Sequence, residues 1–384
     1  MIAGHPIARE LFGTFQYLNP GTIHWGEGCV ARLKGELSRV GAKRVFLITT
    51  GSIARNPAIL APIETAIGGR LVGKTADIAQ HAPVREVARA ARAAREANAD
   101  ALASAGGGSP IDAAKAVAWS LATGIDLAAP DALERARGVQ LAGKPVLAHF
   151  AVPTTLSAAE LSGSSGFSAE GTNEKVGVAA RELVPKAVFY DVALAVHTPL
   201  DLWLSTGIRA VDHAVETLLA PGEHPLPDAA ALESLRLLAM RLREVKAEPA
   251  NRAARTDCQL GAWLSYLLPG PAANGLSHTL GKRIGSRHGI PHGITSCLLL
   301  PHAMRFYLTR RPGPLQRIAA VLRALPATAE AAPAAIATLI AELGLPQHIA
   351  AFGLSKEDLE EAVGPVAGPE FPREALLEIM KAAW

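Results

Sequence analysis

The feature that most constrains the fold is an alternation of short apolar strands with helices over the first half of the chain. Residues 44–52, RVFLITTGS, form a compact β-branched run that ends in small polar residues. The pattern recurs, with strands expected at 71–78, 101–105 and 145–152 and helices at 28–40, 83–98 and 111–123. Continuous apolar strands are typical of a parallel sheet covered on both faces. The alternation therefore predicts a doubly wound α/β domain.

The second half of the chain has a different pattern, because strand signals stop after Asp191. Only helical spacing of apolar residues follows, with helices expected at 202–219, 229–245, 256–268, 314–325 and 333–343. A length of 384 residues also exceeds what one hydrophobic core usually supports. We therefore expect an α/β nucleotide-binding domain over residues 1–195 and an all-helical domain over residues 196–384.

The composition excludes several classes of partner. A formal charge of +3 over 384 residues, with no basic run carrying aromatics, argues against nucleic-acid binding. No apolar run approaches the roughly 20 residues needed to cross a bilayer, and no signal-peptide pattern opens the chain. The three cysteines are scattered without CxxC spacing, as in proteins of a reducing compartment. We expect a cytoplasmic enzyme that binds neither nucleic acid nor membrane.

A glycine-rich turn, Gly106–Ser109, lies between an expected strand and an expected helix. Glycines let the backbone approach a phosphate closely, and the N–H groups at a helix start attract the anion. Pro110 suits the first helical turn, where its missing N–H has no partner. The turn predicts a pyrophosphate site, although it is not the GxGxxG fingerprint, and a plain tight turn is the alternative.

Hydroxyl side chains follow another expected strand, at Thr154, Thr155 and Ser157. They are candidates for contacts to the ribose or the nicotinamide of a dinucleotide. Serine and threonine at such positions also serve as simple helix caps, which is the alternative interpretation.

Residues 274–305 hold four of the twelve histidines, His278, His288, His292 and His302. Histidines at this density indicate metal ligation or proton transfer. The alternative is a basic, solvated loop between two helices, whose glycines keep the backbone pliable.

The segment Gly207–Glu216, GIRAVDHAVE, predicts a helix in which Arg209 and His213 share one face. We expect Asp212 and Glu216 to point elsewhere, into polar contacts or solvent. A single helical histidine is often structural. His213 is a candidate site residue only because a second histidine-rich stretch, at 274–305, could contact it.

Taken in order, these motifs resemble the iron-containing (group III) alcohol dehydrogenase family. The resemblance is carried by GGGSPIDAAKAVA from Gly106, Pro153-Thr154-Thr155, GIRAVDHAVE from Gly207, and GLSHTLG with a later PHG from Gly275. Within that family, QHAPV at 80–84, Tyr190-Asp191 and FQYLNPGTIHWGEG at 15–28 are most similar to maleylacetate reductases.

The resemblance implies a dehydroquinate synthase-like fold, with a cleft between the two domains, and a homodimer. It also implies a nicotinamide cofactor, NADH or NADPH. The residues expected to bind it are Thr50, Gly51, Ser52, Gly106, Gly107, Gly108, Ser109, Asp112, Thr154, Thr155, Ser157, Lys175 and Leu194. A carboxylate after the first strand would favour NADH, but Thr50 and Gly51 stand there with Arg55 close behind, which leaves NADPH open.

The metal site that the family implies is incomplete in this chain. Carried over position by position, the four ligands fall on Arg209, His213, Asn274 and His292. A permanently charged guanidinium opposes a divalent ion, and an amide is at best a weak ligand. We therefore expect no catalytic metal, with His288 as the residue that could restore the set.

The resemblance finally implies a reductase of maleylacetate or a related unsaturated keto-acid, forming 3-oxoadipate in the degradation of aromatic compounds. The expected catalytic residues are Arg209, His213, His278 and His292, with His278 at the position of the family's additional catalytic histidine. The small anionic substrate is expected to contact Asn274, Lys282, Arg283 and Arg287, for which solvated surface is the alternative. The competing functions are an alcohol or aldehyde dehydrogenase, a nucleotide-using lyase of the dehydroquinate synthase type, and a non-catalytic binding protein.

Overall fold

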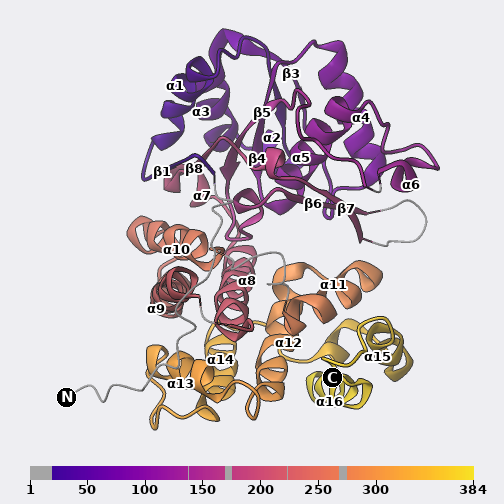
Figure 1. Cartoon of the computed structure of the whole chain (residues 1–384). Coiled ribbons are helices and arrows are strands. Elements are labelled where there is room, and N and C mark those ends of the chain that lie inside the picture. The colour runs from indigo at the N-terminus through magenta and orange to yellow at the C-terminus, as the bar shows by residue number, and fades with distance from the viewer. Residues whose placement is uncertain (1–19, 137, 169–174, 223, 268–274) are drawn as a thin grey trace.

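The computed structural model describes residues 20–384 except for 137, 169–174, 223 and 268–274. Figure 1 shows a sheet flanked by helices in the first half of the chain and a group of helices below it in the second half. This arrangement confirms the predicted α/β domain followed by a helical one.

The sheet of the first half has six strands, and every pairing in it is parallel. Its strand order is β1-β8-β5-β4-β2-β3. The strands are β1 (Thr22–Trp25), β2 (Val45–Ile48), β3 (Leu71–Thr75), β4 (Ala101–Gly106), β5 (Ala148–Pro153) and β8 (Ala187–Tyr190). The helices here are α1 (Leu33–Arg39), α2 (Gly51–Ala54), α3 (Pro57–Ile67), α4 (Val84–Glu96), α5 (Gly108–Thr123), α6 (Ala132–Ala136) and α7 (Val192–Ala195).

Successive residues of β2 show why helices cover both faces of this sheet. Val45 and Leu47 pack into a core with apolar residues of α1 and α3, whereas Phe46 and Ile48 pack with those of α4 and α5. Side chains alternate between the faces of a strand, so an all-apolar strand needs a helical layer on each side. All four residues of β2 are buried, which confirms the doubly wound prediction.

An antiparallel pair, β6 (Ser164–Ser168) with β7 (Lys175–Ala179), was not predicted. The sequence SSGFS has too few apolar residues to display the alternation that marks a strand. The pairing also requires small residues, since a Cβ on Gly177 would lie 2.5 Å from the Ser165 carbonyl oxygen.

The elements described in the second half are helices, which confirms those expected there; residue 268, the last of the helix expected at 256–268, lies outside the described residues. The α-helices are α8 (Leu200–Leu219), α9 (Pro225–Ala247), α10 (Arg252–Ser265), α11 (Leu276–His288), α12 (His292–Phe306), α13 (Pro312–Val321), α14 (Ala331–Glu342), α15 (Lys356–Val363) and α16 (Arg373–Ala383). Helix α8 lies at the centre and packs against α9, α10 and α12. Seventeen of its 20 residues are buried, so polar side chains on this helix need partners inside the protein.

The histidine-rich stretch forms the two helices α11 and α12, so its interpretation as a pliable loop is wrong. Its glycines allow close helix packing instead. A Cβ on Gly293 would lie 2.6 Å from the Ser205 carbonyl oxygen of α8, and one on Gly281 would lie 2.9 Å from Thr295 Oγ1 of α12. These close approaches bring α11 and α12 against α8.

The sequence also predicts that no segment crosses a membrane and that the scattered cysteines belong to a protein of a reducing compartment. None of the described helices is long and apolar enough to cross a membrane. The three cysteines, Cys29, Cys258 and Cys297, are buried free thiols.

Candidate active site

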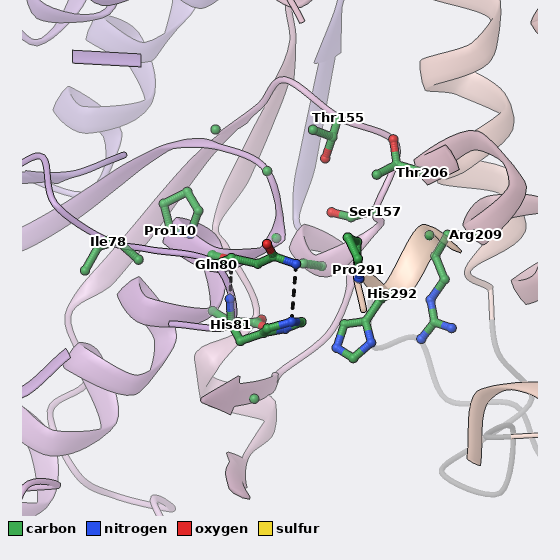
Figure 2. Close-up of a pocket in the computed structure, with 18 of the residues that line it drawn as sticks. Ile78, Gln80, His81, Pro110, Thr155, Ser157, Thr206, Arg209, Pro291 and His292 are labelled. Atoms are coloured by element: carbon green, nitrogen blue, oxygen red, sulfur yellow. Dashed lines mark hydrogen bonds between the residues drawn. The ribbon is translucent and has the colours of Figure 1, made fainter. Parts of the chain in front are cut away.

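A cleft of about 1840 Å³ lies between the carboxyl ends of the parallel strands and the helices α8, α11 and α12. The residues that follow β2, β4 and β5 line one side, and Arg209, His278 and His292 line the other. Figure 2 shows Thr155 and Ser157 of the first half near Arg209 and His292 of the second half. Ligands of open α/β sheets bind at this edge, so the cleft is the candidate active site.

The phosphate side of the cleft is built by the start of α5. Gly107 is the N-cap and offers no side-chain cap, so the first N–H groups of this 16-residue helix lack a side-chain acceptor. A Cβ on Gly107 would lie 3.2 Å from Thr155 Cγ2, and one on Gly108 would lie 3.4 Å from Ser157 Oγ. The buried hydroxyls Thr155 Oγ1 and Ser157 Oγ have no hydrogen-bond partner among the described residues. Phosphate oxygens of a dinucleotide fit these donors.

The other predicted cofactor residues are mostly brought together here. The cleft is lined by Thr50, Gly51, Ser52, Gly106, Gly107, Gly108, Ser109, Asp112, Thr154, Thr155 and Ser157. Leu194 differs, because its side chain is buried in the apolar core of the first half rather than at the cleft. Lys175 is the first residue of β7, and its side chain lies outside what the structure describes.

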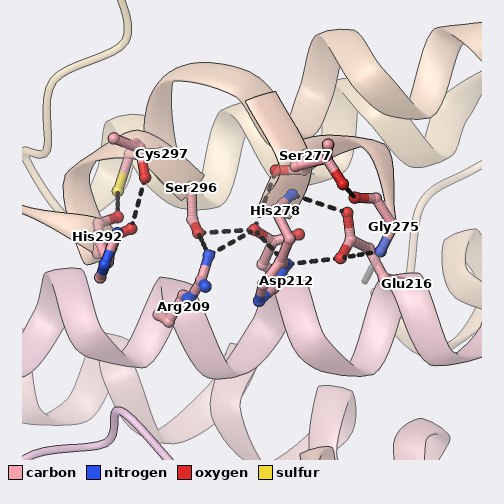
Figure 3. A network of polar contacts seen from close by, with 12 residues as sticks. Arg209, Asp212, Glu216, Gly275, Ser277, His278, His292, Ser296 and Cys297 are labelled. Carbon is pink, nitrogen blue, oxygen red and sulfur yellow. Dashed lines mark hydrogen bonds and ion pairs between the residues drawn. The ribbon is translucent and has the colours of Figure 1, made fainter. Parts of the chain in front are cut away.

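One face of α8 carries four polar residues, of which Arg209 and His213 line the opposite side of the cleft. Arg209, Asp212, His213 and Glu216 are all buried, and Figure 3 shows Arg209, Asp212 and Glu216 facing α11 and α12. Arg209 Nη1 donates to Ser296 Oγ over 3.1 Å and lies 3.7 Å from Asp212 Oδ2. Asp212 and Glu216 make polar contacts, as expected, but the expectation that they lie on another face of the helix is wrong. Their positions three and seven residues after Arg209 place all four on one stripe, a signal that the sequence already contained.

His278 is held by the two carboxylates of that stripe. Its Nδ1 lies 2.5 Å from Glu216 Oε2 and 3.5 Å from Asp212 Oδ2. Its backbone N–H also donates to Glu216 Oε1 over 3.1 Å. Nε2 is buried without a hydrogen-bond partner in the described part of the chain. Nδ1 also meets no hydrogen-bond geometry among the described residues, so the two carboxylates hold the imidazole through ion-pair distances.

The charges of the site shift the pKa values of its two histidines in opposite directions. Burial and the Arg209 charge lower the pKa of His278, but the carboxylates of Glu216 and Asp212 outweigh them and hold it above its usual value. Burial, His278 and Arg209 together lower the pKa of His213 to well below its usual value. The two rings lie 4.7 Å apart. The site therefore favours the charged form of His278 and the neutral form of His213.

Tyr266 also lines the cleft and was missed from the sequence. Its ring meets the His213 ring edge-on at a centroid distance of 4.7 Å. Burial raises the pKa of the phenol, so the hydroxyl keeps its proton. A single tyrosine near the end of a helix gives no pattern that would identify it in advance.

Three of the four predicted substrate-binding residues line the cleft, namely Lys282, Arg283 and Arg287. Asn274 lies outside the described residues. Burial and the Arg209 charge lower the pKa of Lys282, whereas Arg287 forms an ion pair with Glu361 of α15. Lys282 is therefore the more enclosed cation, four residues and one helical turn beyond His278.

The residues present do not fit a divalent metal ion. In the described chain, one set of three possible ligands lies together, Asp212, Glu216 and His278, with ligand atoms within 4.8 Å of one another. Asp212 Oδ2 already accepts hydrogen bonds from Ser277 and Ser296, and the Arg209 guanidinium lies 3.7 Å from it. The carboxylates thus pair with cations of the protein itself. His288, which could have restored the family's ligands, lies 3.7 Å from Asp358 of α15 and outside this set.

The fold and the cleft define a two-part protein in which a nucleotide-binding α/β sheet faces buried histidines of a helical domain. The model of the iron-containing alcohol dehydrogenases matches residues 20–192, and that of the family's C-terminal domain matches residues 203–378. The chain belongs to the iron-containing alcohol dehydrogenase family and is an oxidoreductase.

Maleylacetate reductases are among its most similar relatives. The enzyme of Burkholderia cepacia is 30% identical over 93% of this chain and 92% of its own length. Maleylacetate reductase 1 of Rhodococcus opacus is 28% identical over 95% of both chains. The crystal structure of maleylacetate reductase from Agrobacterium tumefaciens superposes with a TM-score of 0.79 at 26% identity, covering 97% of this chain and 99% of that one. These matches confirm the predicted family and fold.

Proposed function

We propose that the protein reduces maleylacetate, or a closely related unsaturated keto-acid, with NADH or NADPH and without a catalytic metal ion. The observation that carries the proposal is the buried pair of Arg209 and His278, across the cleft from the phosphate site of α5. The relatives named maleylacetate reductase support the substrate class.

The nicotinamide, when bound, supplies a hydride to the carbon–carbon double bond of the substrate. Negative charge then collects on the conjugated ketone oxygen as an enolate. Arg209 is a fixed donor for that oxygen because its guanidinium is held by Ser296 and Asp212. His278 holds a second proton at Nε2, which it can deliver to the enolate carbon directly or through water.

Fixed cations provide the electrostatic stabilisation that a Lewis-acidic ion would otherwise give. The positive groups Arg209 and His278 form ion pairs with the carboxylates of Asp212 and Glu216, so the charges balance within the protein. A divalent ion at the same place would add positive charge beside a guanidinium that cannot lose its proton. This donor chemistry supports a metal-independent reaction.

A dicarboxylic substrate needs cationic partners beyond the reacting carbons. Lys282 lies one helical turn after His278 and lines the same cleft, as does Arg283. We propose that Lys282 pairs with a substrate carboxylate, because an enclosed ammonium gains most from an anionic partner. Simple aldehydes have no group for it, which disfavours the alcohol-dehydrogenase alternative.

The proposal is tested by the loss of reduced-nicotinamide absorbance with a panel of substrates. We expect rapid oxidation of NADH or NADPH with maleylacetate and at least about 100-fold lower kcat/KM with simple aldehydes, since the lost charge-assisted hydrogen bonds are worth about 1.5–3 kcal/mol each. Equal or faster turnover of aldehydes would point to an alcohol dehydrogenase. Tight nucleotide binding with no net oxidation on any carbonyl would point to a lyase.

A further inference from the structure

The order of the strands indicates which way a dinucleotide lies across the sheet. The phosphate site follows β4, which stands between β5 and β2. On the β5 side, the Leu156 N–H donates to Thr206 Oγ1 over 3.2 Å, and Thr206 lies three residues before Arg209 on α8. The reacting nicotinamide half therefore belongs on the β5 side, and the adenosine half belongs over the ends of β2 and β3.

The end of β2 carries a cation where a carboxylate would select NADH. Thr50, Gly51 and Ser52 follow the strand, and the guanidinium of Arg55 lies beside Gly51, with Nη1 3.0 Å from the Cβ position of that residue. Arg55 lines the cleft and forms no hydrogen bond or ion pair with any residue that the structure describes. Thr50 Oγ1 and Ser52 Oγ lie 2.9 Å apart and add two hydroxyls beside it.

A carboxylate lines this end of the cleft, that of Asp77 after β3, and it has partners within the protein. Its Oδ1 accepts a hydrogen bond from Thr75 Oγ1 over 2.5 Å, and its Oδ2 forms an ion pair with Arg89 of α4. The ion pair with Arg89 partly offsets the negative charge of Asp77, which would otherwise repel a 2′-phosphate. The guanidinium of Arg55, by contrast, has no carboxylate partner among the described residues.

We propose that Arg55, assisted by the Ser52 hydroxyl, binds the 2′-phosphate of NADPH and makes the enzyme prefer NADPH to NADH. A guanidinium matches phosphate geometry with two parallel hydrogen bonds, and an arginine in this region accommodates a 2′-phosphate in other dinucleotide folds. The inference rests on the proposed function, because it assumes that a nicotinamide dinucleotide occupies the phosphate site of α5.

Equilibrium binding measures the preference without any turnover. Dissociation constants for NADPH and NADH are measured by nicotinamide fluorescence for the wild-type protein, for Arg55→Gln and for Arg39→Gln. Arg39 is an exposed arginine of α1 outside the cleft, paired with Glu36, so its substitution controls for a general loss of positive charge. Thermal unfolding of the three proteins shows whether each variant is folded.

We expect the wild-type protein to bind NADPH at least about tenfold more tightly than NADH, as one charge-assisted contact allows. Arg55→Gln removes that preference and leaves the NADH affinity within about twofold, whereas Arg39→Gln changes neither affinity. Equal wild-type affinities, or an equal loss for both nucleotides in Arg55→Gln, would overturn the assignment of Arg55 while leaving the reductase proposal intact. Failure of the wild-type protein to bind either nucleotide would contradict the reductase proposal itself.

Discussion

Replacement of Arg209 by alanine tests the proposed enolate stabilisation most sharply. The substitution removes a buried cation that is held 3.1 Å from Ser296 and 3.7 Å from Asp212. Loss of one preorganised donor to a developing oxyanion typically lowers kcat about 100- to 1000-fold, or about 3–4 kcal/mol. Asp212 keeps its hydrogen bonds from Ser277 and Ser296, so we expect the variant to fold.

The assay combines steady-state oxidation of reduced nicotinamide with equilibrium binding of the nucleotide. We expect Arg209→Ala to lose turnover while its nucleotide affinity stays within about twofold, because the phosphate site is built by α5 and the residues after β5. Arg209→Lys is the matched variant, since it keeps a charge but lacks the planar fork, and it should fall between alanine and wild type. A rate for Arg209→Ala within about threefold of wild type would remove this residue from the mechanism.

Four further outcomes follow from the structure. Gly107→Val should weaken nucleotide binding at least about tenfold, because its side chain would crowd Thr155 and fill the phosphate site; unchanged titration curves of a variant that thermal unfolding shows to be folded would contradict this. Activity should decline as pH rises through the raised pKa of His278, which loses the proton it donates; a flat alkaline limb of kcat would refute the proton-donor role. Glu216→Gln removes one carboxylate that raises this pKa, so the decline should begin at lower pH, as pH–rate profiles of the two proteins would show. Burial raises the pKa of Glu160 to about 7, so the folded state binds this proton more tightly. The resulting stability, on the order of 3 kcal/mol, is lost as pH rises through about 7, and the free energy of unfolding of Glu160→Gln should lack that dependence.

The sheet and the helices could be predicted because their signals are local. Four apolar residues in a row, as in β2, fit a strand buried on both faces, and the later helices repeat apolar residues every three or four positions. The pair β6 and β7 could not be predicted, since serine and glycine leave no alternation and the pairing depends on backbone contacts such as that at Gly177.

The candidate site was predictable in its residue types more than in its arrangement. Arg209, His213 and His278 were expected and do line one cleft. The sequence analysis placed Asp212 and Glu216 on a different helix face from Arg209 and so missed their role. Residues three, four and seven positions after Arg209 lie on the same face of a helix. That His278 would contact both carboxylates depends on the packing of α11 against α8, which no local pattern encodes. Leu194 was predicted to bind the cofactor, but its apolar side chain packs in the core and does not line the cleft.

The dependence of the reaction on metal tests the central claim most directly. Protein purified without chelator would be analysed for bound iron and zinc, and its rate with maleylacetate and reduced nicotinamide measured before and after treatment with a strong chelator. The charge balance among Arg209, His278, Asp212 and Glu216 predicts metal far below one ion per chain and an unchanged rate. One tightly bound ion per chain, with activity lost on chelation and restored by Fe²⁺ or Zn²⁺, would contradict the account.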